Sequence, residues 1–206
     1  DIVDLPALVE LGKKYHLLTM IDEAHATGVI GKTGHGTLEH FGSTCKPDIL
    51  MGTLSKALGS EGGYACASKV IIDYLKNKAR SFIFTTSQAP AALAAALRAI
   101  EVLEDEPQRA QSLQHNVDFF LNALHAEGVE AYSPTAIIPV IIGDEATALQ
   151  VADELLANGV LAPAIRYPTV AKGTARLRIA IMSTHTEAEL AQTAKLIGAA
   201  IRKYKK

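Results

Sequence analysis

Apolar residues gather in short continuous runs along the first half of the chain. Leu17–Ile21 and Ile49–Gly52 show no regular polar alternation, which predicts strands of a parallel sheet that is covered on both faces. Tyr64–Ala67 and Phe82–Thr85 are two further runs and predict two more short strands. Because such strands alternate with loops or helical segments, the pattern favours an α/β layer architecture.

Helical spacing of apolar residues predicts helices before and after these runs. Asp4 can cap a first helix, and Pro6 fits its first turn. The alanine-rich stretch Ala89–Leu103 predicts a buried helix. Apolar residues between Leu113 and Leu124 recur at helical spacing and predict a second helix, which ends near Gly128.

The last third of the chain continues the mixed pattern. Ile137–Ile142 predicts a strand, and Thr147–Leu156 predicts an amphipathic helix. Arg176–Ile181 alternates apolar and polar residues, which is typical of a half-buried strand. Thr186 and Glu189 have the spacing of a capping box and predict the start of the last helix.

A charged interruption, Glu104–Glu106, followed by Pro107, separates the two halves of the pattern. We therefore predict a domain boundary here, with one domain over residues 1–106 and another over residues 107–206.

Composition excludes several classes of protein. The 206 residues carry 20 basic and 22 acidic side chains, and a net charge of −2 gives no electrostatic footprint for nucleic acid or an anionic membrane. Apolar runs such as Ile137–Ile142 are too short to cross a bilayer. Cys45 and Cys66 are too few for a disulfide framework, so we expect reduced thiols and a cytoplasmic location.

Two motifs together suggest a nucleotide-hydrolysing enzyme. Asp22–His25 spells the acidic box of a helicase, and Ala26–Thr33 fits a relaxed phosphate-loop pattern. A phosphate loop must join its own strand to a helix, upstream of the acidic strand. Here the loop follows the acidic box directly and lacks its first glycine, so a glycine-rich surface loop is the better interpretation.

The chemistry-bearing residues follow the predicted strands. Ligands of open α/β sheets bind beyond the carboxyl ends of strands, so Asp22 and Lys56 share an edge if their strands are parallel. A carboxylate beside a lysine suits pyridoxal phosphate: the amine forms a Schiff base, and the carboxylate keeps the pyridine nitrogen protonated. Thr53 and Ser55 offer hydroxyls to a phosphate, and His25 can reach the 3-oxygen of the ring.

Each of these residues also has a simpler interpretation. Asp22 can be a turn residue at the end of a strand, and His25 can be an ordinary loop histidine. Lys56 can be a solvated surface lysine. The glycines around Lys56 favour backbone pressed close to a ligand instead, and they lie at positions 52, 59, 62 and 63.

Three motifs, Ile21–Gly28, Gly52–Gly59 and Glu61–Tyr64, resemble those of the α-oxoamine synthases. These are fold-type I pyridoxal-phosphate transferases that join an amino acid to an acyl-CoA with loss of carbon dioxide. The resemblance covers nearly the whole chain and continues through Phe82–Ser87, Ile138–Gly143, Ala164–Val170 and Ala175–Arg178. It implies that residues 1–106 are part of the cofactor-binding large domain and that residues 107–206 are the small C-terminal α+β domain.

The resemblance implies cofactor roles for individual positions. Asp22 would pair with the pyridine nitrogen, His25 with the ring hydroxyl, and Thr53 with the phosphate. Lys56 would hold the cofactor covalently and then act as the base that removes the α-proton of the substrate. Thr86 would reach the phosphate of the partner subunit's cofactor, which implies a homodimer with shared active sites.

Two arginines would bind the carboxylate of the amino acid, namely Arg166 and Arg178. For Arg178 the residue pattern agrees, because it faces away from Leu177 and Ile179, and a guanidinium suits a carboxylate. Arg176 shares the polar face, so a solvated arginine pair is the alternative.

Within the family, Ser55 and the stretch Ile165–Val170 favour the branch that condenses L-alanine with pimeloyl-CoA in biotin biosynthesis. The alternative is 2-amino-3-ketobutyrate CoA ligase, which usually has glycine before the lysine, or another α-oxoamine synthase. Tyr167 departs from the family pattern, which usually has a second proline there.

The resemblance also implies that the amino-terminal half of the family's fold is absent from this chain, which starts at Asp1. That half supplies a glycine-rich phosphate loop and several strands. We therefore expect the 206 residues to be a fragment that binds the cofactor poorly and does not turn over substrate by itself. A non-catalytic remnant is the rival hypothesis.

Overall fold

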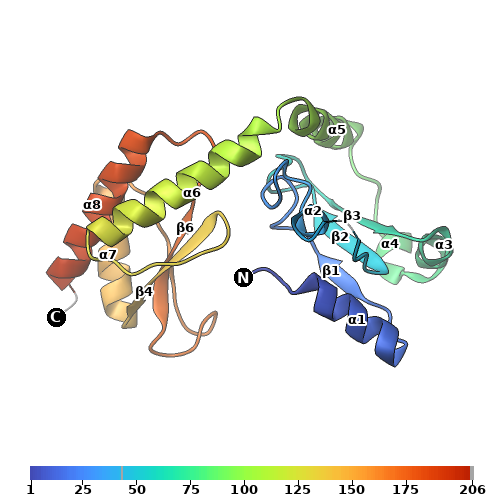
Figure 1. The fold of residues 1–206 in the computed structure, drawn as a ribbon, viewed down its shortest axis with the longest axis horizontal. Helices are drawn as coiled ribbons and strands as arrows, with labels where there is room; N and C mark the ends of the chain where they lie inside the picture. Colours follow the sequence, from blue (N-terminus) through green and yellow to red (C-terminus); the bar gives the residue numbers. More distant parts are fainter. Residues whose placement is uncertain (43, 205–206) are drawn as a thin grey trace. The chain divides into compact units, whose positions relative to one another are not determined.

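The computed structural model describes residues 1–42 and 44–204, and the chain divides into two compact units, Ile2–Gln111 and Ser112–Lys206 (Figure 1). The first unit contains α1 (Leu5–Tyr15), β1 (Met20–Asp22), α2 (Thr37–His40), β2 (Ile49–Thr53), β3 (Gly63–Ala67), α3 (Lys69–Lys78), α4 (Arg80–Ile83) and α5 (Pro90–Asp105). Helix α6 (Gln108–Ala126) leads into the second unit, which contains β4 (Ile137–Gly143), α7 (Glu145–Ala157), β5 (Ala164–Ile165), β6 (Ala175–Ala180) and α8 (Glu187–Tyr204). No helix in the described ranges combines the length and the hydropathy that crossing a bilayer requires.

The sheet of the first unit has the order β1-β2-β3, with β1 parallel and β3 antiparallel to β2. Hydrogen bonds between Thr19 and Asp48 fix the register at the start of the parallel pair of β1 and β2. The Asp48 carboxylate accepts hydrogen bonds from the Thr19 backbone N–H at 2.7 Å and from the Thr19 hydroxyl at 2.8 Å. These two bonds hold the pKa of Asp48 below its usual range. The parallel pairing of β1 with β2 confirms the predicted parallel arrangement of these two strands.

Helix α1 covers one face of this sheet, as its sequence predicts. The Asp4 carboxylate caps the helix by accepting from the Ala7 backbone N–H at 3.1 Å. Leu5 and Val9 are buried and pack with Ile21 of β1 in one hydrophobic cluster. This cluster fixes α1 across the face of the sheet to which Ile21 points.

The prediction that the first strand is covered on both faces is wrong for this structure. The strand is limited to β1, and Leu17, Leu18 and Met20 are 62%, 74% and 56% exposed. β1 is an edge strand, and the face that carries Met20 has no second layer among the described residues. An apolar run predicts burial on both faces, but burial requires elements on both sides of the sheet.

Two other expectations for the first unit need correction. Phe82–Thr85 is not a strand, because α4 ends at Ile83 and the following residues form a turn. A run of four apolar residues fits a helical turn as well as a strand, and only its neighbours decide. The alanine-rich helix exists as α5, but only Ala96 is buried in it. The sequence pattern gave no indication of α3.

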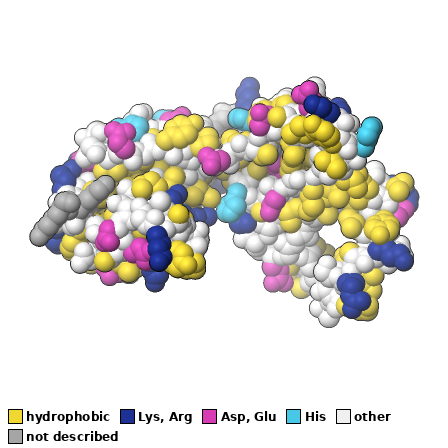
Figure 2. Space-filling model, turned by 90° about the horizontal axis from the view of Figure 1, so that it is seen from below, with side chains coloured by type: hydrophobic (Ala, Val, Ile, Leu, Met, Phe, Trp, Pro, Cys, Tyr) yellow, Lys and Arg dark blue, Asp and Glu magenta, His cyan; other side chains and the backbone are white. Residues whose placement is uncertain are grey.

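Hydrophobic side chains gather on the surface of the first unit, on the right of Figure 2. They come from the segment before β1 and from α3, α4 with the residue that follows it, and α5, and the most exposed are Leu17, Leu18, Val70, Tyr74, Phe82, Phe84 and Leu97. Apolar exposure of this extent marks a surface that is suited to cover by further protein.

The second unit has an antiparallel sheet of order β4-β6-β5 with α7 packed on it and α8 packed on α7. The predicted alternation of β6 is confirmed, since Leu177 and Ile179 are buried and Arg178 is exposed. The predicted capping box is also confirmed: the Thr186 backbone N–H donates to Glu189 Oε2 at 2.8 Å, and the Glu189 N–H donates back to the Thr186 hydroxyl.

Candidate active site

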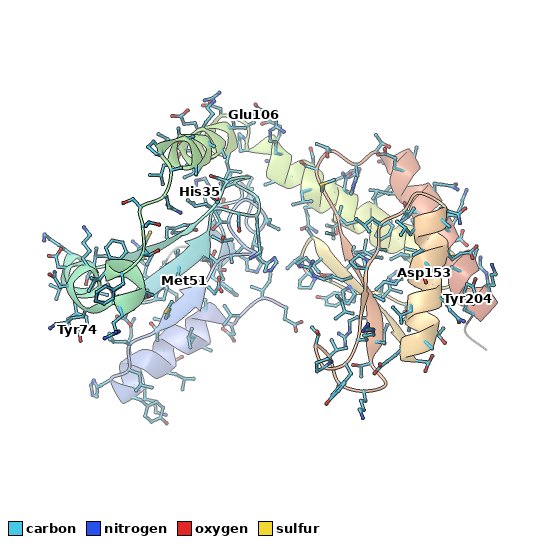
Figure 3. The ribbon with its side chains drawn as sticks, turned by 180° about the vertical axis from the view of Figure 1, so that it is seen from behind. His35, Met51, Tyr74, Glu106, Asp153 and Tyr204 are labelled. Atoms are coloured by element: carbon cyan, nitrogen blue, oxygen red, sulfur yellow. The ribbon has the colours of Figure 1, made fainter. Side chains whose placement is uncertain are left out.

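Strands β1 and β2 end at the same edge of the first sheet. Asp22, the last residue of β1, pairs with Met51 of β2, and the Glu23 backbone N–H donates to the Met51 carbonyl at 2.7 Å. Side chains two residues apart on a strand share a face, so Asp22, Met51 and Thr53 lie on one face of the sheet. Figure 3 shows Met51 within this sheet and His35 on the loops beyond its carboxyl edge.

Asp22 is exposed and has two features that bear on its role. Its Oδ1 atom accepts a hydrogen bond from the Ala24 backbone N–H at 2.8 Å, so the side chain does stabilise the turn that follows the strand. Oδ2 has no hydrogen bond among the described residues. The turn carries His25 to the same edge of the sheet, where its side chain is exposed.

The loop that follows β2 presents Lys56 to solvent. Leu54 and Leu58, two residues on either side of Lys56, are buried in a cluster with Ala96 of α5. Backbone bonds close the loop, since the Leu54 N–H donates to the Gly62 carbonyl at 2.9 Å. The two buried leucines therefore anchor the loop to α5 and leave the lysine between them exposed.

Hydroxyl groups stabilise the start of this loop. Thr53 Oγ1 donates to the Gly62 carbonyl at 3.0 Å and lies 2.7 Å from Ser55 Oγ. The Ser55 backbone N–H donates to Thr53 Oγ1 at 3.2 Å. Both hydroxyls thus lie at the carboxyl end of β2, close to each other and next to Lys56 in the chain.

The loops that carry His25 and Lys56 touch each other. Gly28 has a φ of +78°, and a Cβ atom placed on it would lie 2.6 Å from the Cβ of Ala57. No side chain fits in that space, so glycine permits the close approach as well as the backbone conformation. The contact places the segment Asp22–Gly28 against the residue that follows Lys56.

Thr86 lies in the loop between α4 and α5 and is exposed. The same loop is tied to the Lys56 loop by Gln88, whose Nε2 donates to the Glu61 carbonyl at 3.1 Å. Glu61 precedes Gly62, which accepts the hydrogen bond from Thr53. Thr86 is therefore two residues from a side chain that contacts the loop of Lys56.

The two predicted substrate arginines belong to the second unit. Arg178 is exposed on the polar face of β6, and its guanidinium makes no hydrogen bond or ion pair within the described ranges. Arg176 shares that face, but its Nε donates to the Thr174 carbonyl at 3.0 Å. Arg166 directly follows β5, which pairs with β6, and it is exposed. The two arginines of β6 thus differ in their partners.

The glycine-rich stretch Ala26–Thr33 is not a phosphate loop in this structure. It follows β1 through turns and leads only to the four-residue helix α2. The carboxylate of Glu39 accepts from the backbone N–H groups of Thr33 and His35, each at 3.1 Å. The Glu39 carboxylate therefore accepts the hydrogen bonds that these N–H groups would otherwise donate to a phosphate. This supports the interpretation of Ala26–Thr33 as a surface loop.

Residues 1–197 of the chain match the family model described as aminotransferase class I and II. The chain belongs to the class I and II aminotransferase family. In this family, an 8-amino-7-oxononanoate synthase from Bacillus subtilis is 48% identical over 198 residues, which are 96% of this chain and 50% of that protein. The chain thus spans about half the length of the curated relatives it matches.

Solved structures of this family show the same fold. One is a variant of serine palmitoyltransferase from S. paucimobilis with a bound PLP–myriocin aldimine. It superimposes on this chain with a TM-score of 0.91 and 28% sequence identity, and the match covers 100% of this chain and 52% of the palmitoyltransferase chain. An 8-amino-7-oxononanoate synthase from Francisella tularensis has a TM-score of 0.78 and 29% sequence identity, and the match covers 96% of this chain and 59% of the synthase chain. The predicted fold-type I transferase architecture is confirmed.

Sequence reasoning missed three residues of this aminotransferase-family chain that hold the site's loops. Glu23 is 2% exposed, and its Oε2 accepts from the Thr37 backbone N–H at 2.8 Å. Glu39 holds the glycine-rich loop, and Tyr64 contacts both Gly52 and Thr27. The role of Tyr64 could have been predicted from the sequence, because an aromatic residue on the neighbouring strand often covers a strand glycine.

Proposed function

We propose that the protein is an α-oxoamine synthase that uses pyridoxal phosphate to join an amino acid to an acyl-CoA with loss of carbon dioxide. One relationship carries this proposal: Asp22 and Thr53 share a face and an edge of the sheet, and the loop of Lys56 touches the loop that follows Asp22. The sequence resemblance favours L-alanine and pimeloyl-CoA as substrates, in biotin biosynthesis, and the relatives named 8-amino-7-oxononanoate synthase support that branch.

The residues at this edge suit pyridoxal phosphate by their chemistry. Lys56 offers an exposed amine to the aldehyde, and Asp22 has a carboxylate oxygen available for a protonated ring nitrogen. Thr53 and Ser55 bring hydroxyls for the phosphate, and His25 is assigned to the 3-oxygen of the ring. Lysine, carboxylate and hydroxyls are the donor set that this cofactor requires.

When bound, pyridoxal phosphate supplies an electron sink for the charge that develops at the α-carbon of the amino acid. Asp22 would keep a proton on the ring nitrogen. Lys56 would hold the cofactor through its aldehyde and would take the α-proton of the amino acid at Nζ as a general base. Arg166 and Arg178 would bind the substrate carboxylate through charge-assisted hydrogen bonds. These roles are assignments for the complete enzyme.

We further propose that the first unit is part of a large cofactor-binding domain and that the second is the small C-terminal domain. Thr86 then reaches the phosphate in the partner subunit, so the enzyme acts as a homodimer with shared sites. The exposed apolar surface of the first unit supports assembly with further protein. We place the activity in the cytoplasm, in keeping with two free cysteines.

Covalent labelling of the chain tests the cofactor assignment. The chain, joined behind the amino-terminal half of the Bacillus subtilis relative, is incubated with pyridoxal phosphate, reduced with borohydride and mapped by peptide analysis. We expect one dominant adduct at Lys56, which Lys56→Ala removes. Lys69→Ala is the matched control, because its side chain is 86% exposed on α3, and it should leave the adduct unchanged. Labelling scattered over surface lysines would support the non-catalytic remnant instead.

A second experiment tests the substrates. The chain is joined behind the amino-terminal half of the Bacillus subtilis relative, and release of CoA is measured with alanine, glycine and serine against acetyl-, pimeloyl- and palmitoyl-CoA. We expect release that depends on Lys56 and is fastest with alanine and pimeloyl-CoA. A preference for serine with palmitoyl-CoA would assign the protein to another branch, in line with the structural likeness to serine palmitoyltransferase.

A further inference from the structure

Tyr64 lies across the middle strand of the first sheet, behind the proposed site. It stands on β3 directly opposite Gly52 of β2. A Cβ atom placed on Gly52 would lie 2.5 Å from the hydroxyl oxygen of Tyr64 and 2.6 Å from Cζ. The aromatic ring therefore occupies the space that any other residue at position 52 would need for its own side chain.

The hydroxyl of Tyr64 reaches beyond β2 to the loop that follows β1. It lies 2.8 Å from Oγ1 of Thr27, within hydrogen-bonding distance, and both side chains are half-buried. Residues that share the register of Gly52 face away from Asp22 and Thr53, so the link runs along the opposite face of the sheet. One tyrosine thus connects β3, β2 and the β1 loop.

The position of Thr27 gives this link its consequence. Thr27 lies between His25 and Gly28, and its backbone N–H donates to the Glu23 carbonyl at 3.0 Å. Gly28 is the residue that meets Ala57, next to Lys56. Fixing Thr27 therefore fixes how the loop of His25 lies against the loop of Lys56.

We propose that Tyr64 is a positioning residue, whose hydroxyl bond to Thr27 holds the His25 loop against the Lys56 loop. It does not contact the cofactor, since it faces the other side of the sheet. The consequence for cofactor binding rests on the function proposed above. The structural part of the proposal, that the hydrogen bond between Tyr64 and Thr27 limits motion of the His25 loop, is independent of that function.

Four variants and one control test the link. Tyr64→Phe and Thr27→Val each remove one hydroxyl and keep the size of the side chain, whereas Thr27→Ser keeps the hydroxyl. Tyr74→Phe is the matched control, because Tyr74 lies on α3 and is 65% exposed. The double variant, Tyr64→Phe with Thr27→Val, shows whether the two hydroxyls act as one unit.

Amide hydrogen exchange over residues 24–36 is the first measurement. Loss of one hydrogen bond of this kind should speed exchange of these amides roughly 3- to 10-fold, without an equal change in α1 or in the second unit. The double variant should exchange no faster than either single variant, and Thr27→Ser should resemble the wild type. Unchanged exchange in both Tyr64→Phe and Thr27→Val would overturn the proposal.

Formation of the reduced Lys56 adduct is the second measurement. If the link positions the loop, Tyr64→Phe and Thr27→Val should raise the pyridoxal phosphate concentration needed for half-maximal labelling, while Thr27→Ser restores it. Faster exchange with unchanged labelling would overturn the positioning role. If the wild-type chain, joined behind the amino-terminal half of the Bacillus subtilis relative, forms no adduct at Lys56, the proposed function fails, and the exchange data alone then decide whether the link holds the loop.

Discussion

Asp22 and Glu23 are consecutive carboxylates that lie on opposite faces of the first sheet's carboxyl edge. Asp22 is exposed beside the loops of the proposed site, whereas Glu23 is buried behind it and holds the N–H of Thr37. Glu23 directly follows β1, and its backbone N–H continues the pairing with Met51, so the period of two along a strand produces this division. One dipeptide thus supplies a candidate catalytic group and an anchor for the loop that follows.

Replacing Asp22 by asparagine should separate the chemical role of this residue from its role in the turn. The amide oxygen can still accept from the Ala24 N–H, so the fold should be unchanged. Without its charge the side chain cannot keep the ring nitrogen protonated, and α-proton exchange of alanine should slow by about 100-fold or more in the joined enzyme. Exchange is followed by NMR in deuterium oxide.

The matched control for this variant is Asp105→Asn, at the exposed end of α5, which should leave the rate unchanged. A rate for Asp22→Asn equal to that of the wild type would limit Asp22 to the turn, which is the simpler interpretation of its position.

Glu23 should stabilise the loop that leads to α2 through one of its two carboxylate oxygens. Oε2 accepts from Thr37, while Oε1 has no hydrogen-bond partner among the described residues. Glu23→Gln keeps an oxygen acceptor and should be tolerated. Glu23→Ala leaves the Thr37 N–H unsatisfied and opens a cavity, which should cost about 2 kcal/mol or more of unfolding free energy.

Hydrogen exchange of the Thr37 amide and urea unfolding measure the two Glu23 variants. Equal exchange of this amide in Glu23→Ala and in the wild type would show that the carboxylate does not hold the loop.

Glu39 should make the glycine-rich loop sensitive to acid. Partial burial works to raise the pKa of Glu39, but hydrogen bonds from the Thr33 hydroxyl and from the N–H groups of His35 and Thr33 lower it below 4.5 overall. Because the folded-state pKa lies below the unfolded one, this stabilisation is present above pH 4.5 and is lost as the pH falls through the lowered pKa.

Amide exchange of Thr33 and His35, followed from pH 6 to pH 3 and corrected for intrinsic rates, should show the loop opening at the acidic end. Glu39→Gln should abolish this dependence and open the loop at all these pH values. A loop that opens with the same pH profile in both proteins would point to a different titrating group.

Arg178 and Arg176 share a face of β6 and should differ in function. Arg176 donates to the Thr174 carbonyl, whereas Arg178 has a guanidinium that can take a substrate carboxylate. Arg178→Gln should raise the KM for the amino acid at least 10-fold, with little effect on stability, because the side chain is exposed. Arg176→Gln should have the smaller effect on KM. Steady-state kinetics of the joined enzyme decide this, and equal effects would support a solvated pair.

Gly52 should tolerate no side chain while Tyr64 covers it. Gly52→Ala must displace the ring of Tyr64, so the Thr27 link should break and the loop should open. Adding Tyr64→Ala should relieve the steric part of the destabilisation, and thermal unfolding of the single and double variants measures this coupling. Strictly additive effects would show that the ring is not the obstacle.

Local pattern determined much of this protein. Strand and helix identities follow from spacing and capping, as in α1 with Asp4 and in the alternation of Leu177, Arg178 and Ile179. The motifs around Asp22 and Lys56 were also sufficient to indicate a family. These features depend on residues that are near each other in the chain, which is why sequence reasoning reaches them.

Tertiary structure alone decided which faces are covered and which loops meet. The Leu17–Ile21 run predicts burial on both sides, yet Met20 is exposed, because burial depends on elements that lie elsewhere. Phe82–Thr85 turned out to lie at the end of a helix rather than in a strand for the same reason. The contact of Gly28 with Ala57 and the link from Tyr64 to Thr27 join residues about 30 or more positions apart, and no local pattern encodes such a distance.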